Sequence, residues 1–118
     1  MHKSKNLFKS FLYALKGIAL ATKERNFTIQ LAVGTAAIIL AVILDISGAE
    51  MEIIIVLIAL VLASEAINSA IERLLDFVSQ ERRDEIREIK DLMAGAVLIF
   101  SVTAAVVGTY IFANAILR

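Results

Sequence analysis

Three long apolar stretches constrain the fold of this chain most strongly. They lie at about residues 28–46, 52–78 and 92–117 and consist mainly of Leu, Ile, Val and Ala. A helix needs about 20 residues to cross the hydrocarbon core of a bilayer. Lipid offers no partners for backbone N–H and C=O groups, so a spanning segment of this kind must be helical. We therefore predict an all-α membrane protein with three transmembrane helices at these positions.

The composition excludes several other classes of protein. Hydrophobic residues make up 59% of the 118 residues, which is more apolar surface than a soluble domain of this size can bury. The chain contains no cysteine, which excludes disulfides and thiolate metal sites, and its formal net charge of zero gives no field that favours nucleic acid. We expect a single domain, 1–118, whose apolar excess faces lipid or an oligomer interface.

The N-terminal segment, residues 1–26, has an amphipathic pattern. Its lysines recur at helical spacings on one face: Lys5, Lys9, Lys16 and Lys23. Leu, Phe and Ile side chains occupy the opposite face. This pattern is typical of a helix that lies in the membrane interface with its lysines toward water and head groups. The alternative is an ordinary helix packed on the rest of the protein.

The distribution of charge predicts the orientation. The N-terminal segment is rich in lysine, and the 79–91 linker carries four basic residues: Arg82, Arg83, Arg87 and Lys90. The 45–52 linker holds only acidic charges, and its Gly48 suits a tight turn. Basic loops remain on the cytoplasmic side of a membrane. We therefore predict that the N-terminus and the 79–91 loop are cytoplasmic.

Four polar side chains in the second apolar stretch form the most informative pattern. Their spacings of three, four and four residues place them on one narrow face of a helix: Glu65, Asn68, Glu72 and Asp76. Charged groups at membrane depth are costly, so they usually face a bundle interior, a cavity or an active site. From the helical rise we expect Glu72 and Asp76 near the cytoplasmic interface, with Glu65 about two turns deeper.

Two further motifs lie on the same cytoplasmic side. Lys90-Asp91 precedes the third apolar stretch, and Glu24-Arg25-Asn26 precedes the first. Together the three groups offer carboxylates for Mg²⁺, a lysine for phosphate and a deeper carboxylate that can act as a base. No P-loop motif is present, so a nucleotide would be bound by other means. The pattern favours phosphoryl transfer at the membrane surface.

Other interpretations assign the polar face a different task. It could be an interhelical clamp in which Asn68 bonds to a neighbouring helix and the acids pair with Arg73 or Lys90. It could also belong to a small transport or proton-conducting subunit in which Glu65 is the protonated carboxylate. A third possibility is a non-catalytic assembly protein that uses this face to form oligomers.

The motifs together resemble those of the bacterial integral membrane diacylglycerol kinases and the related undecaprenol kinases. The resemblance covers nearly the whole chain and rests on Glu65-Ala66-Ile67-Asn68-Ser69-Ala70-Ile71-Glu72 with Asp76, Lys90-Asp91, Ala94-Gly95-Ala96-Val97-Leu98 and Glu24-Arg25-Asn26. Two of these motifs, Glu24-Arg25-Asn26 and Ala94-Gly95-Ala96-Val97-Leu98, look closer to the undecaprenol kinases. The chain lacks tryptophan and has Asn6 where the diacylglycerol kinases carry arginine. The acceptor therefore stays open between diacylglycerol and undecaprenol.

The resemblance implies an ATP-dependent lipid kinase of the bacterial inner membrane, which acts as a homotrimer with shared active sites. By position, Glu65 matches the general base that contacts the lipid hydroxyl, with Asn68 beside it. Glu24 and Glu72 match the ligands of the Mg²⁺ that accompanies ATP. The remaining matches are nucleotide-contacting residues: Tyr13, Glu81, Arg82, Arg83, Lys90 and Asp91.

Overall fold

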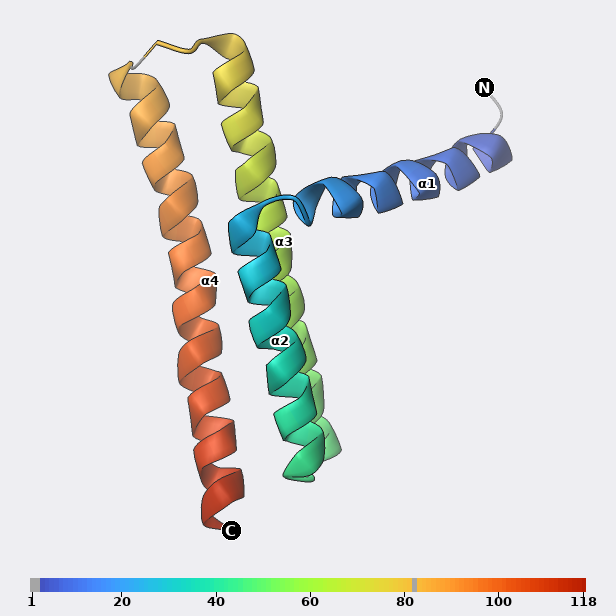
Figure 1. Cartoon of the computed structure of the whole chain (residues 1–118), viewed down its shortest axis with the longest axis vertical. Coiled ribbons are helices and arrows are strands. Elements are labelled where there is room, and N and C mark those ends of the chain that lie inside the picture. The colour runs from blue at the N-terminus through green and yellow to red at the C-terminus, as the bar shows by residue number, and fades with distance from the viewer. Residues whose placement is uncertain (1–2, 82) are drawn as a thin grey trace.

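The protein is a bundle of three long helices with a fourth helix projecting from its side (Figure 1). The computed structural model describes residues 3–81 and 83–118, with side chains from Asn6 onward, and forms four helices there: α1 (Lys3–Ala21), α2 (Arg25–Ile43), α3 (Gly48–Val78) and α4 (Asp84–Leu117). In this part of the chain, α2, α3 and α4 are long and apolar enough to cross a membrane. The prediction of an all-α membrane protein with three such helices is confirmed.

The helices differ in length, and this difference sets the depth of every polar group. With 19 residues, α2 is about 28 Å long at 1.5 Å per residue, which matches the hydrocarbon core. The 31 residues of α3 and the 34 residues of α4 make both helices longer than that core. Their ends near the α3–α4 connection extend past the start of α2 (Figure 1). These ends therefore project beyond the hydrocarbon.

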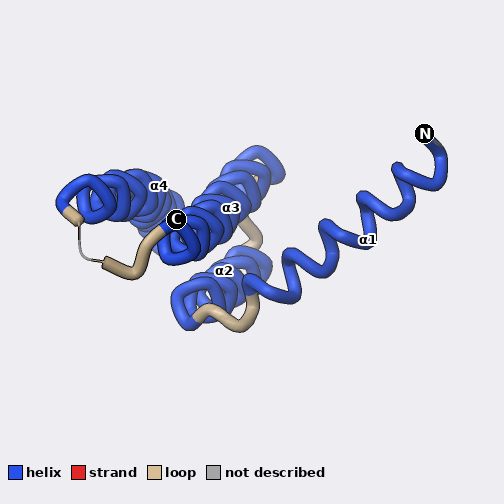
Figure 2. Tube along the Cα trace, turned by 90° about the horizontal axis from the view of Figure 1, so that it is seen from above, coloured by secondary structure: helices blue, strands red, loops and turns tan. Residues whose placement is uncertain are grey.

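The helix boundaries differ from the predicted segments, most of all at the start of α4 and at the end of α1. α4 begins at Asp84, inside the charged linker at 79–91, because water permits a helix to continue and the acids Asp84 and Glu85 favour its N-terminus. α1 ends at Ala21, earlier than the predicted limit of the 1–26 segment, and residues 1–2 lie outside the described residues. The short connection that follows α1, Thr22–Glu24, changes the direction of the chain sharply (Figure 2).

The turn between α2 and α3 depends on Asp45. This residue has a φ of 53°, in the left-handed region that a short polar side chain tolerates. The N–H of Ile46 donates to Ala41 O at 3.3 Å, and the N–H of Asp45 donates to Val42 O at 3.1 Å, which closes the end of α2. Gly48, which the sequence indicated for the turn, is instead the first residue of α3. A capping box between Ser47 and Glu50 begins that helix.

α3 is the central helix and contacts each of the other three. The most buried apolar cluster, Ala41, Ile54 and Ile111, takes one residue from each of α2, α3 and α4. It lies in the half of the bundle that contains the α2–α3 turn and the C-terminus (Figure 1). Many other apolar side chains are exposed in a single chain, such as Ile99 at 69%. This surface faces lipid or further protein.

The closest approach of α2 to α3 occurs at Gly34. A Cβ atom built on Gly34 would lie 2.8 Å from Cγ2 of Ile58, whereas one built on Gly108 would meet nothing within 4 Å. Only a residue without a side chain therefore fits between these helices. α2 and α4 have few contacts, so this approach largely determines where α2 lies.

We expect the substitution Gly34→Ala to destabilise the bundle by about 1–3 kcal/mol, the usual cost of overpacking. Thermal denaturation in detergent micelles should show a lower midpoint for Gly34→Ala. The matched variant Gly108→Ala should leave the midpoint unchanged or raise it slightly, because alanine is the better helix former. Equal midpoints for the two variants would contradict this view of the α2–α3 contact.

Candidate functional site

The polar residues of α3 share one face, as their spacing predicts, but they differ in exposure. Glu65 is only 6% exposed, whereas Glu72 and Asp76, nearer the end of the helix, are exposed. Ser64 is also buried, and its hydroxyl donates to Val61 O at 2.7 Å within the same helix. Glu65 is thus the deepest charged side chain of this face.

A small pocket joins this face to the start of α2. Its volume is about 170 Å³, and it is lined by Glu24, Arg25, Asn26, Glu65, Asn68, Ser69 and Glu72. The structure therefore brings together four of the residues that were predicted from the sequence: Glu24, Glu65, Asn68 and Glu72. We call this the carboxylate pocket.

The hydrogen bonds in the carboxylate pocket leave one fully buried polar atom without a partner among the described residues. Asn68 donates from Nδ2 to Oε1 of Glu72 at 3.3 Å. The buried Oδ1 of Asn68 accepts no hydrogen bond within the described residues. A buried amide oxygen of this kind is costly unless something donates to it. Asn68 therefore carries an unused, fully buried acceptor about one helical turn from Glu65.

The clamp interpretation is met only in part, since Asp76 pairs with Lys90, whereas Asn68 bonds to Glu72 of its own helix and not to a neighbouring one. Arg73 Nη2 lies 2.9 Å from Glu24 Oε1, and Lys90 Nζ lies 3.1 Å from Asp76 Oδ1. The clamp thus accounts for Asp76 alone among the acids of the α3 face, and Glu65 and Glu72 have no ion-pair partner among the described residues.

A second charged cavity lies between the last turn of α3 and the first turns of α4. It has a volume of about 460 Å³ and is lined by Asp76, Ser79, Gln80, Glu81, Arg83, Asp84, Ile86, Arg87 and Lys90. Three of the predicted nucleotide-contacting residues thus lie together: Glu81, Arg83 and Lys90. Asp91 is exposed and lies outside the cavity lining, and Arg82 lies outside the described residues.

Tyr13 lies apart from both of these cavities. It is 63% exposed on α1, which projects away from the bundle (Figure 2). The ammonium group of Lys16 lies 5.7 Å from its ring centroid, within the range of a cation–π contact. A single chain therefore divides the predicted site residues among three places.

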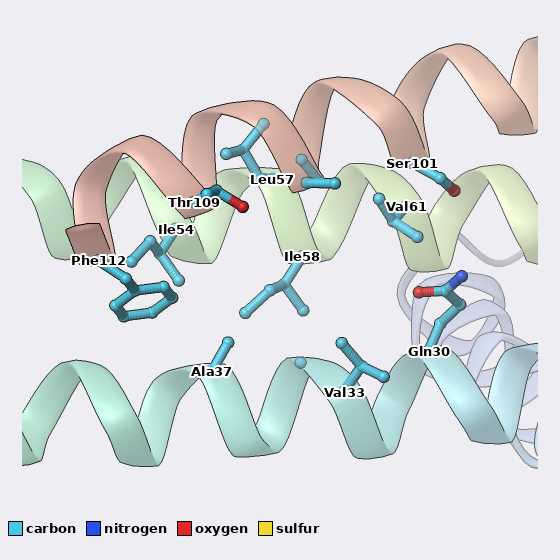
Figure 3. A pocket seen from close by; sticks show the side chains of 14 residues that line it. Gln30, Val33, Ala37, Ile54, Leu57, Ile58, Val61, Ser101, Thr109 and Phe112 are labelled. Carbon is cyan, nitrogen blue, oxygen red and sulfur yellow. The ribbon is translucent and has the colours of Figure 1, made fainter.

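A separate apolar groove lies nearer the middle of the bundle than the carboxylate pocket. It lies between α2, α3 and α4, has a volume of about 410 Å³, and contains Ile54, Ile58 and Val61 of α3 (Figure 3). Val61 is four residues before Glu65, and Gln30 is four residues after Asn26, so the groove begins one helical turn below the pocket. Small residues such as Ala37 and Gly108 form its walls.

Gln30 was not identified as a site residue from the sequence. Its amide lies at the end of the groove closest to Ser101 and Val61 (Figure 3). The available signal was a single amide within an uncharged span, since such groups usually face protein rather than lipid. Gln30 also follows Asn26 at the spacing of one turn, which places both on the same side of α2.

A second apolar space lies on the other side of Glu24 and Ser69, under α1. This crevice has a volume of about 640 Å³ and is bordered by α1, α2 and α3, with Arg73 at its polar edge. Glu24 and Ser69 line both the crevice and the carboxylate pocket. These two residues therefore form the wall between the two spaces.

The carboxylate pocket has the donor atoms that a hard divalent cation requires. Glu24 and Glu72 both line it. The described residues contain no group of three or more His, Cys, Asp or Glu side chains arranged to hold a metal ion. Mg²⁺ commonly takes one or two protein carboxylates and completes its shell with water and substrate phosphates. The residues present fit a Mg²⁺ ion that arrives with a nucleotide.

Comparisons with known proteins agree with the sequence motifs. The chain is 36% identical over 106 residues to the undecaprenol kinase of Bacillus subtilis (strain 168), covering 89% of this chain and 86% of that protein. It is 34% identical over 105 residues to a diacylglycerol kinase of Synechocystis sp., covering 87% of this chain and 60% of that protein. A diacylglycerol kinase of Sinorhizobium sp. is 32% identical over 107 residues, covering 91% and 78%.

The match to a family extends over most of the chain. Residues 12–112 match the family described as prokaryotic diacylglycerol kinase, and this range includes α2 and α3, most of α4 and half of α1. It contains the carboxylate pocket, the second charged cavity and the groove. The predicted family is confirmed: the chain belongs to the prokaryotic diacylglycerol kinase family.

Proposed function

We propose that the protein transfers the γ-phosphate of ATP to the hydroxyl group of a long-chain membrane alcohol, diacylglycerol or undecaprenol. The observation that carries this proposal is the position of the carboxylate pocket about one helical turn from an apolar groove. The pocket offers charge for a phosphate–metal complex, and the groove offers apolar contact for a lipid tail. The names of the similar proteins support the same class of acceptor.

In the proposed reaction, Glu65 accepts the proton of the acceptor hydroxyl as its oxygen attacks the γ-phosphorus. A new O–P bond forms, the bond from the γ-phosphorus to the β,γ-bridging oxygen breaks, and ADP leaves. Asn68 lies beside the base, and its Nδ2 donates to Oε1 of Glu72, which helps to hold that carboxylate in the pocket. A positioned base of this kind contributes about 10²–10⁴-fold to a rate.

Charge neutralisation would come from two sources. Glu24 and Glu72 would hold Mg²⁺, which offsets negative charge on the phosphates when bound. Lys90 would neutralise further charge from the second cavity, near the predicted nucleotide contacts Glu81 and Arg83. Asp91 keeps its predicted role as a nucleotide contact. ATP is a cytoplasmic substrate, so the α3–α4 connection and the N-terminus would face the cytoplasm, as the basic residues also indicate.

Assembly of three copies would bring the separated residues together. Tyr13 and Lys90 lie in different places of one chain, and α1 leaves much of its surface exposed. In a homotrimer, α1 of one subunit can cover the pocket of the next, which would place Tyr13 near a nucleotide. The exposed apolar faces of α2 and α4 provide enough surface for such contacts.

Replacement of Glu65 tests the chemical step. We expect Glu65→Gln to lower kcat at least about 100-fold, because glutamine cannot accept the proton. Transfer of labelled phosphate from Mg-ATP to diacylglycerol and to undecaprenol would be measured in mixed micelles, and the comparison of the two acceptors identifies the preferred one. Glu52→Gln, an exposed acid near the other end of α3, is the matched control and should retain activity.

A proton-conducting subunit predicts a different result. It needs Glu65 but gives no task to Glu72, so Glu72→Gln would leave flux through reconstituted vesicles intact. The kinase proposal requires that Glu72→Gln loses phosphate transfer and that neither variant changes proton flux. Full kinase activity in Glu65→Gln would remove that residue from the role of base.

The variant Lys90→Met tests the second cavity. The pair with Asp76 is exposed, with side chains 40% and 61% accessible, so its loss should change the free energy of unfolding by less than about 1 kcal/mol. We expect an almost unchanged thermal midpoint together with a raised KM for ATP. A large fall in the midpoint would mean that the pair serves folding instead.

The apolar groove can be tested by filling it. Ala37 lines the groove, whereas its neighbour Ala36 is exposed and does not. We expect Ala37→Phe to raise KM for a long-chain acceptor at least about tenfold, because each methylene that loses apolar contact costs about 0.8 kcal/mol. The KM for a diacylglycerol with short, six-carbon acyl chains should change little.

Two control variants distinguish the groove from the neighbouring surface of α2 and from the crevice under α1. Ala36→Phe adds the same ring at nearly the same depth on the adjacent side of α2 and should leave both KM values unchanged. Ala63→Phe adds it to the crevice under α1. A rise in KM for Ala63→Phe alone would assign the lipid tail to that crevice.

A further inference from the structure

The local backbone around Glu24 does not determine the direction of its side chain. Glu24 is the last residue of the connection between α1 and α2, with extended backbone angles of φ −83° and ψ 129°. Its side chain makes no capping hydrogen bond to the start of α2. The backbone of the connection is held, since Thr28 Oγ1 donates to Thr22 O at 2.9 Å and lies 3.1 Å from Glu24 O. The direction of the carboxylate must come from another contact.

That contact is made by Arg73 of α3. Its Nη2 donates to Glu24 Oε1 at 2.9 Å, across 49 residues of sequence. A guanidinium–carboxylate hydrogen bond of this length is short and directional. It ties the α1–α2 connection to the helix that carries Glu65 and Glu72.

The geometry places Arg73 behind Glu24 with respect to the pocket. Arg73 lines the crevice under α1 together with Glu24 and is not among the residues that line the carboxylate pocket. The preceding residue, Glu72, does line that pocket. Consecutive residues of a helix point about 100° apart, so Glu72 and Arg73 face different spaces. Glu24 thus lies between Arg73 on one side and the pocket on the other. Oε1 is bound by Arg73, and no hydrogen bond to Oε2 is formed by the described residues.

The Arg73–Glu24 ion pair is expected to contribute little to the stability of the fold. The side chains of Arg73 and Glu24 are 53% and 39% exposed, and solvent-exposed ion pairs contribute little to folding. In contrast, partners that hydrogen-bond to a metal-binding carboxylate typically change metal affinity by about 10–100-fold when they are removed. The pair is better explained by the direction that it gives to the carboxylate.

We propose that Arg73 is a positioning residue that holds Glu24 in the orientation required to bind the divalent cation accompanying the nucleotide. This inference rests on the proposed function, because it takes Glu24 and Glu72 as the cation ligands. Arg73 lies outside the lining of the carboxylate pocket, so it would act on the cation through Glu24. It differs from the predicted site residues in that no motif identifies it, and its task follows from its contact with Glu24 alone.

The test measures cation binding directly. Purified protein in detergent is titrated with Mn²⁺ in the presence of ADP, and free Mn²⁺ is followed by electron paramagnetic resonance. We expect Arg73→Gln to raise the Kd for Mn²⁺ at least about tenfold. Arg73→Lys, which retains the charge without the planar guanidinium, should fall between Arg73→Gln and the wild type. Thermal midpoints of all variants should stay close to that of the wild type.

Lys23→Gln is the matched control, because it removes one positive charge from the residue next to Glu24 and should leave the Kd unchanged. An unchanged Kd in Arg73→Gln, while Glu72→Gln weakens binding, would overturn the role of Arg73 and leave the proposed function intact. Tighter binding in Arg73→Gln would also overturn it, since Arg73 would then compete with the cation. Failure of the wild type to bind Mn²⁺ would overturn both proposals.

Discussion

The structure depends on the difference in length between α2 and its two neighbours. Because α2 is only as long as the hydrocarbon core is thick, its first residues must lie at the membrane surface. α3 passes this level and continues, so the residues of its last turns leave the hydrocarbon without breaking the helix. Acidic side chains on one continuous face thus begin inside the membrane at Glu65 and end in water at Asp76. A charged site at the boundary follows directly from this arrangement.

Much of this could be predicted from the sequence. The spacing of Glu65, Asn68 and Glu72 placed them on one face, because helical periodicity relates residues within a single segment. The position of Glu24 beside them could not be obtained from periodicity, since it depends on how α2 packs against α3; the family resemblance implied it. The tight contact at Gly34 and the left-handed Asp45 also remained hidden. Both depend on packing and on turn geometry, which a hydrophobicity pattern does not contain.

The family resemblance groups the predicted nucleotide-contacting residues together, whereas the fold of a single chain brings only some of them together. Glu81, Arg83 and Lys90 lie around one cavity because α4 begins as a helix in water and turns Lys90 toward Asp76. Tyr13 does not join them, because the direction of α1 in one chain carries it away from the bundle. One chain therefore places Glu81, Arg83 and Lys90 around a common cavity and leaves Tyr13 apart from them. In the homotrimer proposed above, contacts between chains would complete the remainder of the site.

The groove between α2 and α4 has a consequence for how such a protein meets its acceptor. Its walls are mostly apolar, so under the proposed function a long-chain alcohol would enter it sideways from the bilayer without its tail entering water. The quantity that governs occupancy is then the mole fraction of alcohol in the bilayer rather than its concentration in solution. Turnover would respond to dilution by other lipids and be indifferent to the volume of the surrounding compartment.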